Sequence, residues 1–142
     1  MKRNFIATPK GGVDILLVAL ISCFIFHSVI GLFSQYFFDY IYQYFSLSYN
    51  GIMELYLWTP LTYPFLHDGP FHLIMNLLGL YFIGKGVEHI IGTTNFWYLA
   101  IIGSTCGCSF WLLTNSNGGF LIGASAIVMS CLSYYCLRNP ST

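Results

Sequence analysis

The stretch FLIGASAIVMSCLSYYCL, residues 120–137, carries no charged residue over nearly the length of a membrane span and therefore indicates a helical membrane fold. A helix needs about 20 apolar residues to cross the hydrocarbon core of a bilayer. In lipid, such a helix must satisfy its own backbone hydrogen bonds. Within the stretch, Ser125 stands among the small residues Gly123, Ala124 and Ala126. A serine in this setting is either part of a helix-packing surface or a nucleophile on the turn that begins a helix.

The composition of the whole chain indicates a membrane protein. Of the 142 residues, 56% are hydrophobic and only 7% are charged, whereas a soluble domain has about 25% charged residues. The formal net charge is zero and no basic patch or arm is present, which argues against nucleic acid as a partner. We therefore expect the lipid bilayer to be the solvent of a multi-pass integral membrane protein.

Three further apolar runs precede the first-quoted stretch, at about 15–33, 70–86 and 96–113. Together with 120–137 they predict an all-α, polytopic membrane helix bundle of about four transmembrane helices. No linker or internal repeat divides the chain, so we expect residues 1–142 to form a single membrane domain. The segment between the first two runs is rich in Tyr, Phe and Trp, which favours short helices lying at the outer interface of the bilayer.

The basic residues predict the orientation. Lys2, Arg3 and Lys10 precede the first run, Lys85 lies between the second and third, and Arg138 follows the fourth. With four spans, all five fall on one side of the membrane. By the positive-inside rule, this side and the N-terminus are on the inner, cytoplasmic face.

Three polar residues are predicted to lie at similar depth near the outer surface. The second and fourth runs cross in the same direction, and His72 and Ser125 lie near their outer starts, with Asn76 one helical turn below His72. Asp68 is a candidate cap for the second helix. Each residue has a structural alternative: Ser125 in helix packing, His72 at the interface, and Asn76 in an interhelical hydrogen bond. Their shared depth favours an outward-opening polar site.

Several motifs resemble those of the rhomboid family of intramembrane serine proteases. Residues 58–76, WTPLTYPFLHDGPFHLIMN, resemble the first outer loop and second span of that family. Residues 83–92, IGKGVEHIIG, resemble the junction before its third span, and Gly123-Ala124-Ser125-Ala126 resembles its nucleophile motif. The similarity runs from about residue 58 to residue 137 and implies a rhomboid-like membrane domain.

The resemblance also implies roles for individual residues. Ser125 would be the nucleophile, His72 and Asn76 would stabilise the oxyanion, and Gly123 would leave room in the nucleophile loop. The implied activity is cleavage of membrane-protein substrates near the outer face by a serine-type endopeptidase, without metal or cofactor. The implied partners are transmembrane-helix substrates or clients within the bilayer.

One departure from the family concerns helix packing. Ala126 stands where the family usually has glycine after the serine, so we expect its methyl group to crowd a helix contact or the nucleophile loop. The third run carries Gly103 and Gly107, a GxxxG pair that lets two helices approach closely. We assign this pair to packing.

A second departure concerns the general base, which the family places as a histidine on a later span. The sequence shows no such span after residue 137, so we expect an apparently truncated, N-terminal part of the core that is silent unless a separately encoded C-terminal part completes it. The spacing of His27, His67 and His89 from Ser125 does not indicate that any of them is the general base. His72 could itself act as the base, although the family assigns it to the oxyanion. The alternative function is a non-catalytic pseudoprotease or remnant that binds transmembrane helices.

Overall fold

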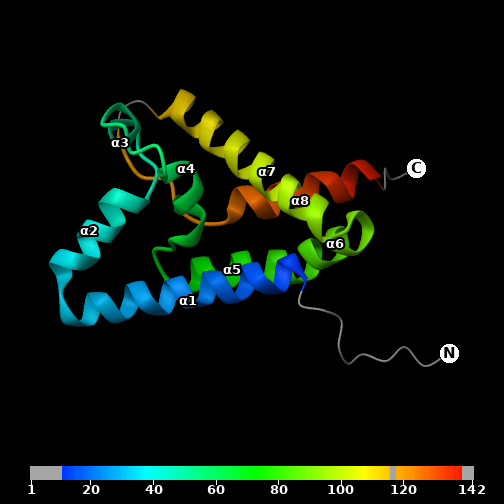
Figure 1. Ribbon diagram of the computed structural model, residues 1–142, viewed down its shortest axis with the longest axis horizontal. Helices are drawn as coiled ribbons and strands as arrows, with labels where there is room; N and C mark the ends of the chain where they lie inside the picture. The colour runs from blue at the N-terminus through cyan, green and yellow to red at the C-terminus, as the bar shows by residue number, and fades with distance from the viewer. Residues whose placement is uncertain (1–10, 116–117, 139–142) are drawn as a thin grey trace.

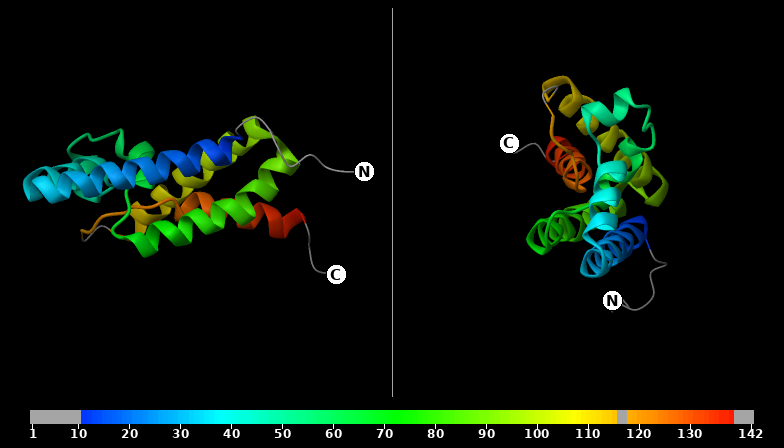
Figure 2. Two further views of the ribbon diagram at one scale, coloured as in Figure 1. Left: turned by 90° about the horizontal axis from the view of Figure 1, so that it is seen from below. Right: turned by 90° about the vertical axis from the view of Figure 1, so that its left-hand side faces the viewer.

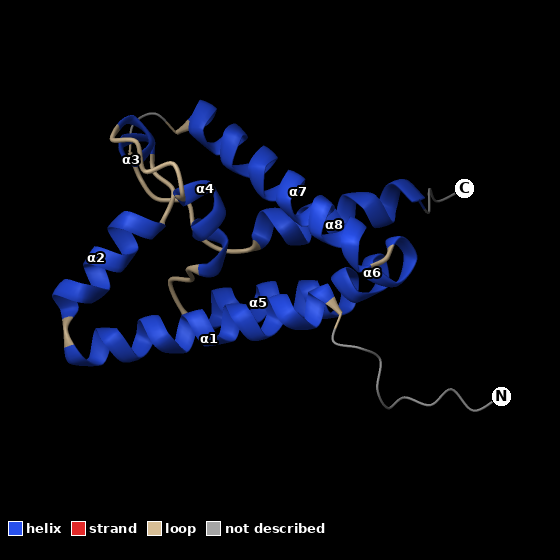
Figure 3. Ribbon diagram, in the orientation of Figure 1, coloured by secondary structure: helices blue, strands red, loops and turns tan. Residues whose placement is uncertain are grey.

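The computed structural model describes residues 11–115 and 118–138, and its regular elements within these ranges are helices (Figures 1 and 3). The all-α prediction is therefore confirmed. In chain order the elements are α1 (Gly12–Phe33), α2 (Gln35–Phe45), α3 (Tyr49–Met53), α4 (Thr59–Thr62), η1 (Tyr63–Phe65), α5 (Pro70–Gly79), η2 (Leu80–Gly84), α6 (Lys85–Ile91), α7 (Thr93–Thr114) and α8 (Ser125–Arg138).

Within the described residues, three helices are long and apolar enough to cross a membrane: α1, the continuous helix Pro70–Ile91 and α7, each of 22 residues. Pro70–Ile91 is made of α5, a π-helical turn (η2) and α6. It runs five residues beyond the predicted end at residue 86 and stops where Gly92 takes a φ of 81°. That left-handed conformation is readily available to glycine.

The fourth apolar run, predicted as a span over 120–137, is helical only from Ser125 to Arg138. These 14 residues rise about 21 Å at 1.5 Å per residue, less than the thickness of the hydrocarbon core. The five residues before Ser125 are not helical because the backbone of Leu121 pairs with that of Leu47, with N···O distances of 3.1 and 2.8 Å. The prediction that the helix begins near residue 120 is therefore wrong.

The long helices alternate in direction along the chain. Figures 1 and 2 show α1 and α7 running one way while α5 and α8 run the other, so α5 and α8 both begin on the side where α2 to α4 gather. The buried core joins α1, Pro70–Ile91, α7 and α8 through side chains that include Leu20, Leu73, Leu80, Phe96 and Ile127.

The outward faces of these helices are also apolar. Val18 and Phe26 on α1 and Ile102 on α7 are among many large hydrophobic side chains that are more than half exposed. A helix that is hydrophobic on all sides is expected to be buried in protein or to span a membrane, not to lie at a water interface. The fold therefore agrees with a bundle whose outer surface contacts the bilayer.

Two of the five basic residues lie in the described part of the chain. Lys85 is the first residue of α6 and Arg138 is the last of α8, and Figure 1 shows α6 and the end of α8 on the same side of the bundle. Lys85 pairs with Asp14 at the start of α1, with an Nζ–Oδ1 distance of 2.7 Å. Lys2, Arg3 and Lys10 fall outside the described residues.

Candidate functional site

Ser125 is the first residue of α8 and its side chain is exposed. The turn that leads into it is held by the long segment between α1 and α5. The N–H of Gly123 donates to the carbonyl of Tyr63 at 2.9 Å, and the Tyr63 hydroxyl donates to the carbonyl of Ser104 on α7 at 2.9 Å. Buried Tyr63 thus connects the turn before the serine to the third long helix.

Gly123 is needed both for its conformation and for its missing side chain. Its φ is 95°, a left-handed conformation that is costly for other residues. A Cβ atom built on it would lie 2.5 Å from His72 Nε2 and 3.5 Å from Asn76 Nδ2. The glycine therefore lets the histidine ring and the asparagine amide lie directly against the backbone that precedes Ser125.

His72 and Asn76 occupy successive turns of one face of α5. The Asn76 amide donates to the His72 carbonyl at 3.0 Å and is almost completely buried. An asparagine amide has two N–H donors, so one remains for another acceptor. The structure brings together Gly123, His72 and Asn76, with Ser125 two residues beyond Gly123. Ser125 itself forms no hydrogen bond to a histidine within the described residues.

Asp68 does not cap the helix, as the sequence had suggested. Gly69 is the cap residue of α5, and it has no side-chain hydrogen bond. The Asp68 carboxylate instead accepts from His72 Nδ1, with an Oδ1–Nδ1 distance of 2.8 Å. The capping prediction failed because the carboxylate has a competing partner one turn into the helix.

His67 packs against His72, beside the cluster formed by Gly123, His72 and Asn76. Its ring packs edge-on against His72 with 4.9 Å between the ring centroids. The side chain is buried, and neither ring nitrogen has a hydrogen-bond partner in the described structure. Burial, and next the neighbouring His72, lower the pKa of His67 to about 4, so this ring is neutral at physiological pH.

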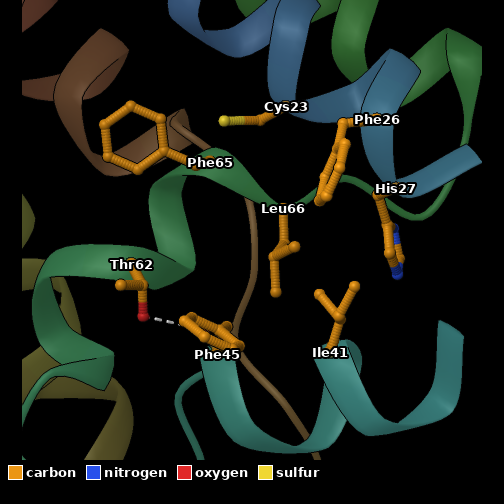
Figure 4. Close-up of a pocket in the computed structure, with 8 residues that line it drawn as sticks. All are labelled: Cys23, Phe26, His27, Ile41, Phe45, Thr62, Phe65 and Leu66. Carbon is orange, nitrogen blue, oxygen red and sulfur yellow. Dashed lines mark hydrogen bonds between the residues drawn. The ribbon is translucent and has the colours of Figure 1, made fainter. Parts of the chain in front are cut away.

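The other histidines lie in different surroundings. His27 stacks on Phe38 with 4.0 Å between centroids and lines an apolar cavity of about 300 Å³ between α1, α2 and the segment before α5 (Figure 4). His89 is on α6, beside Glu88 and Lys85 at the opposite end of α5–α6. Within residues 11–115 and 118–138, no three His, Cys, Asp or Glu side chains lie close enough together to hold a metal ion.

The packing prediction for Gly103 and Gly107 agrees with the structure. A Cβ on Gly103 would lie 2.5 Å from the Cβ of Ser130, and one on Gly107 would lie 2.6 Å from the Cβ of Ala126. Both glycines face α8. The methyl group of Ala126 is therefore accommodated against Gly107 on α7 and points into the helix contact.

The fold and these contacts define a polytopic helical membrane protein in which a histidine and an asparagine of α5 contact the turn that leads into a serine at the start of α8. The family model of the Rhomboid domain matches residues 54–142, and the chain belongs to the rhomboid family. It is 27% identical over 86 residues to the rhomboid protease GlpG of Pectobacterium atrosepticum, covering 61% of this chain and 30% of that protein. It is 26% identical over 91 residues to GlpG of Yersinia pestis, covering 64% and 32% respectively. The match thus spans about a third of the length of these curated relatives.

Two residues of this site were given no part in it by sequence reasoning. Asp68 was interpreted as a cap, although its spacing of four residues from His72 was a usable signal. No sequence pattern indicated Tyr63, because it acts through its backbone carbonyl and through a hydroxyl that bonds to α7.

Proposed function

We propose that this chain carries the nucleophile and oxyanion side of an intramembrane serine endopeptidase site that acts on membrane-protein substrates near the outer face. The observation that supports it best is the contact of His72 and Asn76 with Gly123, two residues before Ser125. Two polar side chains of α5 thereby contact the backbone turn that leads into Ser125 at the start of α8.

The chemistry follows from the donors around Ser125. Attack of the Ser125 hydroxyl on a peptide carbonyl creates an oxyanion, which is stabilised by preorganised N–H groups. The free N–H of Asn76 and the first N–H groups of α8, which have no intrahelical acceptor, are suited to this role. The positive end of the α8 dipole adds to the stabilisation of negative charge.

The test is covalent labelling of the purified protein by a fluorophosphonate probe in detergent. Ser125→Ala should abolish labelling, and Asn76→Ala should slow it by about 10²–10³-fold, the usual effect of one lost oxyanion donor. Ser133→Ala is the matched control, because Ser133 is also exposed on α8 but its hydroxyl is bonded to the Met129 carbonyl. Labelling that survives Ser125→Ala would overturn the assignment of the nucleophile.

A second candidate function is non-catalytic binding of transmembrane helices. It is favoured by one observation: the exposed Ser125 hydroxyl has no histidine hydrogen bond within the described residues. Under this alternative the folded protein shows no Ser125-dependent labelling between pH 5 and 10, yet still binds a transmembrane peptide. That result would remove the protease proposal.

The proposed orientation places Ser125 on the outer side and Lys85 and Arg138 on the inner side. The support is that the cluster and these two basic residues lie at opposite ends of the bundle (Figure 1). A topology reporter inserted after Gly119 should report the outer compartment. A signal from the inner compartment would reverse the orientation.

A further inference from the structure

The cavity between α1, α2 and the segment before α5 is bounded mainly by hydrocarbon (Figure 4). Cys23 and Phe26 come from α1, Ile41 and Phe45 from α2, and Leu66 from the segment before α5. The volume is about 300 Å³, twice that of an apolar cavity of about 150 Å³ that stays dry and binds benzene. Water is therefore not expected to fill this cavity.

The lining side chains that carry nitrogen or oxygen, His27 and Thr62, already have partners in the protein. The Thr62 hydroxyl donates to the carbonyl of Phe45 at 2.7 Å (Figure 4). His27 Nε2 donates to the carbonyl of Phe38 at 3.3 Å, and its ring stacks on the same residue. A ligand in the cavity therefore meets mainly C–H groups, and a hydrocarbon chain can occupy it without leaving a polar group unpaired.

The cavity opens on the surface of the bundle, beside Phe26 and Phe45. These two lining side chains are 64% and 41% exposed, whereas Leu66 and His27 are buried. Ile25, the neighbour of Phe26 on α1, is also more than half exposed, and α1 is long and apolar enough to span a membrane. The opening therefore faces the hydrocarbon of the bilayer.

The elements around the cavity indicate which lipid suits it. On α2, the ring centroids of Tyr40 and Tyr44 are 4.3 Å apart, and tyrosine prefers the headgroup region of a bilayer. The cavity beside α2 is therefore expected at the depth where acyl chains leave the headgroups. No Lys or Arg occurs from residue 11 to residue 84, so these elements offer no cation to an anionic headgroup. The exposed carboxylate of Asp39 on α2 suits the ammonium group of a zwitterionic lipid.

We propose that this cavity binds one acyl chain of a zwitterionic phospholipid. Scaled from benzene, which has six carbons, a volume of about 300 Å³ holds about ten to twelve carbons, a large part of one chain. The hydrophobic effect contributes little, because lipid tails are as apolar as the lining. The gain is in dispersion, since an unfilled cavity leaves its lining atoms without contact partners. The bound chain thus fills the space between α1 and α2.

The test is photo-crosslinking of the full chain in phosphatidylcholine nanodiscs that contain a phosphatidylcholine with a diazirine in the middle of one acyl chain. Adducts are mapped by peptide mass spectrometry. Cys23 and Ile41 are partly buried, whereas Phe110 on α7 is 70% exposed. We expect adducts on Cys23 and Ile41 to exceed those on Phe110 by about tenfold or more, the ratio that ~1.4 kcal/mol of preference gives. Lipid that merely surrounds the protein would label the more exposed Phe110 more strongly.

Two variants fill the cavity with protein atoms. Ile41→Trp fills it from α2 and should bring the Cys23 adducts down to the level of Phe110. Ile25→Trp is the matched control, because Ile25 is 56% exposed on α1 and does not line the cavity, and it should leave the Cys23 adducts unchanged. Cys23→Phe fills the cavity from α1 and is followed through the adducts on Ile41. The unfolding temperature of each variant is measured alongside, so that either filling variant suffices if the other does not fold.

Four outcomes would overturn the proposal. Adducts in proportion to exposure, with Phe110 above Ile41, would show only surrounding lipid. Cavity adducts that persist in a folded filling variant would place the chain elsewhere. Adducts that disappear as more protein is added per disc would assign the cavity to a second copy of this chain. Stronger labelling from a phosphatidylglycerol probe than from the phosphatidylcholine probe would contradict the zwitterionic headgroup. No step involves Ser125, so the result is independent of the proposed protease activity.

Discussion

Replacing Gly123 by alanine tests the geometry of the whole site. The added Cβ would meet His72 Nε2 at 2.5 Å and Cε1 at 2.7 Å, whereas non-bonded carbon atoms prefer about 3.5–4.0 Å. The ring must therefore move by about 1 Å. Because Asp68 holds the same ring at 2.8 Å from its other side, this movement should stretch the Asp68–His72 hydrogen bond.

The magnitude has two parts. A left-handed backbone, here with a φ of 95°, costs a non-glycine residue about 1–2 kcal/mol. Overpacking against the His72 ring adds about 1–3 kcal/mol. We therefore expect Gly123→Ala to lower the free energy of unfolding by about 2–5 kcal/mol, a large share of a typical stability of about 5–15 kcal/mol.

The assay is reversible denaturation in detergent, with fluorophosphonate labelling as the functional measurement. Gly86→Ala is the control, because a Cβ on helical Gly86 has nothing within 4 Å and should be neutral or stabilising by up to about 1 kcal/mol. Combining Gly123→Ala with His72→Ala removes the steric part and should leave only the backbone part. A Gly123→Ala variant within about 0.5 kcal/mol of wild type would refute the reasoning.

Three further predictions concern packing, the contact of Glu88 with the start of α1, and acid stability. Gly107→Ala should destabilise the protein by about 1–3 kcal/mol, because the added Cβ would lie 2.6 Å from that of Ala126. Adding Ala126→Gly should recover part of this loss. Strictly additive changes in unfolding free energy for the two substitutions would contradict the contact. Glu88→Ala should cost about 2–4 kcal/mol in denaturation assays, because its carboxylate accepts from the N–H groups of Gly12 and Val13; an unchanged stability would show that this anchor is unimportant. The pKa of His67 is about 4 in the folded protein and about 6.5 in the unfolded chain. The unfolded chain therefore binds the proton first as the pH falls. The free energy of unfolding decreases below pH 6.5, by about 2.5 kcal/mol at pH 4.5. His67→Gln should flatten this pH dependence, and an equally steep loss in that variant would assign it to other groups.

Much of the bundle could be predicted from sequence because hydropathy is a local property. The runs at 15–33 and 96–113 fall on α1 and α7, since about 20 uncharged residues suffice to specify a spanning helix. Spacing also predicted that Gly103 and Gly107 would lie in a close helix contact, as they do against α8.

The shared position of His72 and the segment before Ser125 was predictable for a similar reason. Counting spans gives their direction, and two helices that run the same way bring their starts to the same end of a bundle. In the structure, His72 and Asn76 lie against Gly123, two residues before Ser125. The shared end of the two helices does not depend on the angles at which they pack.

Composition and chain direction therefore sufficed to predict the membrane environment, the helical class and the shared end of the bundle at which His72 and Ser125 lie. Only the tertiary structure decided where α8 begins, which group Asp68 binds and which nitrogen of His72 faces the serine turn. Leu121 is not helical because its backbone bonds to that of Leu47. Asp68 does not cap α5 because its carboxylate bonds to His72. Such choices between competing hydrogen-bond partners depend on distances between segments that no local pattern encodes.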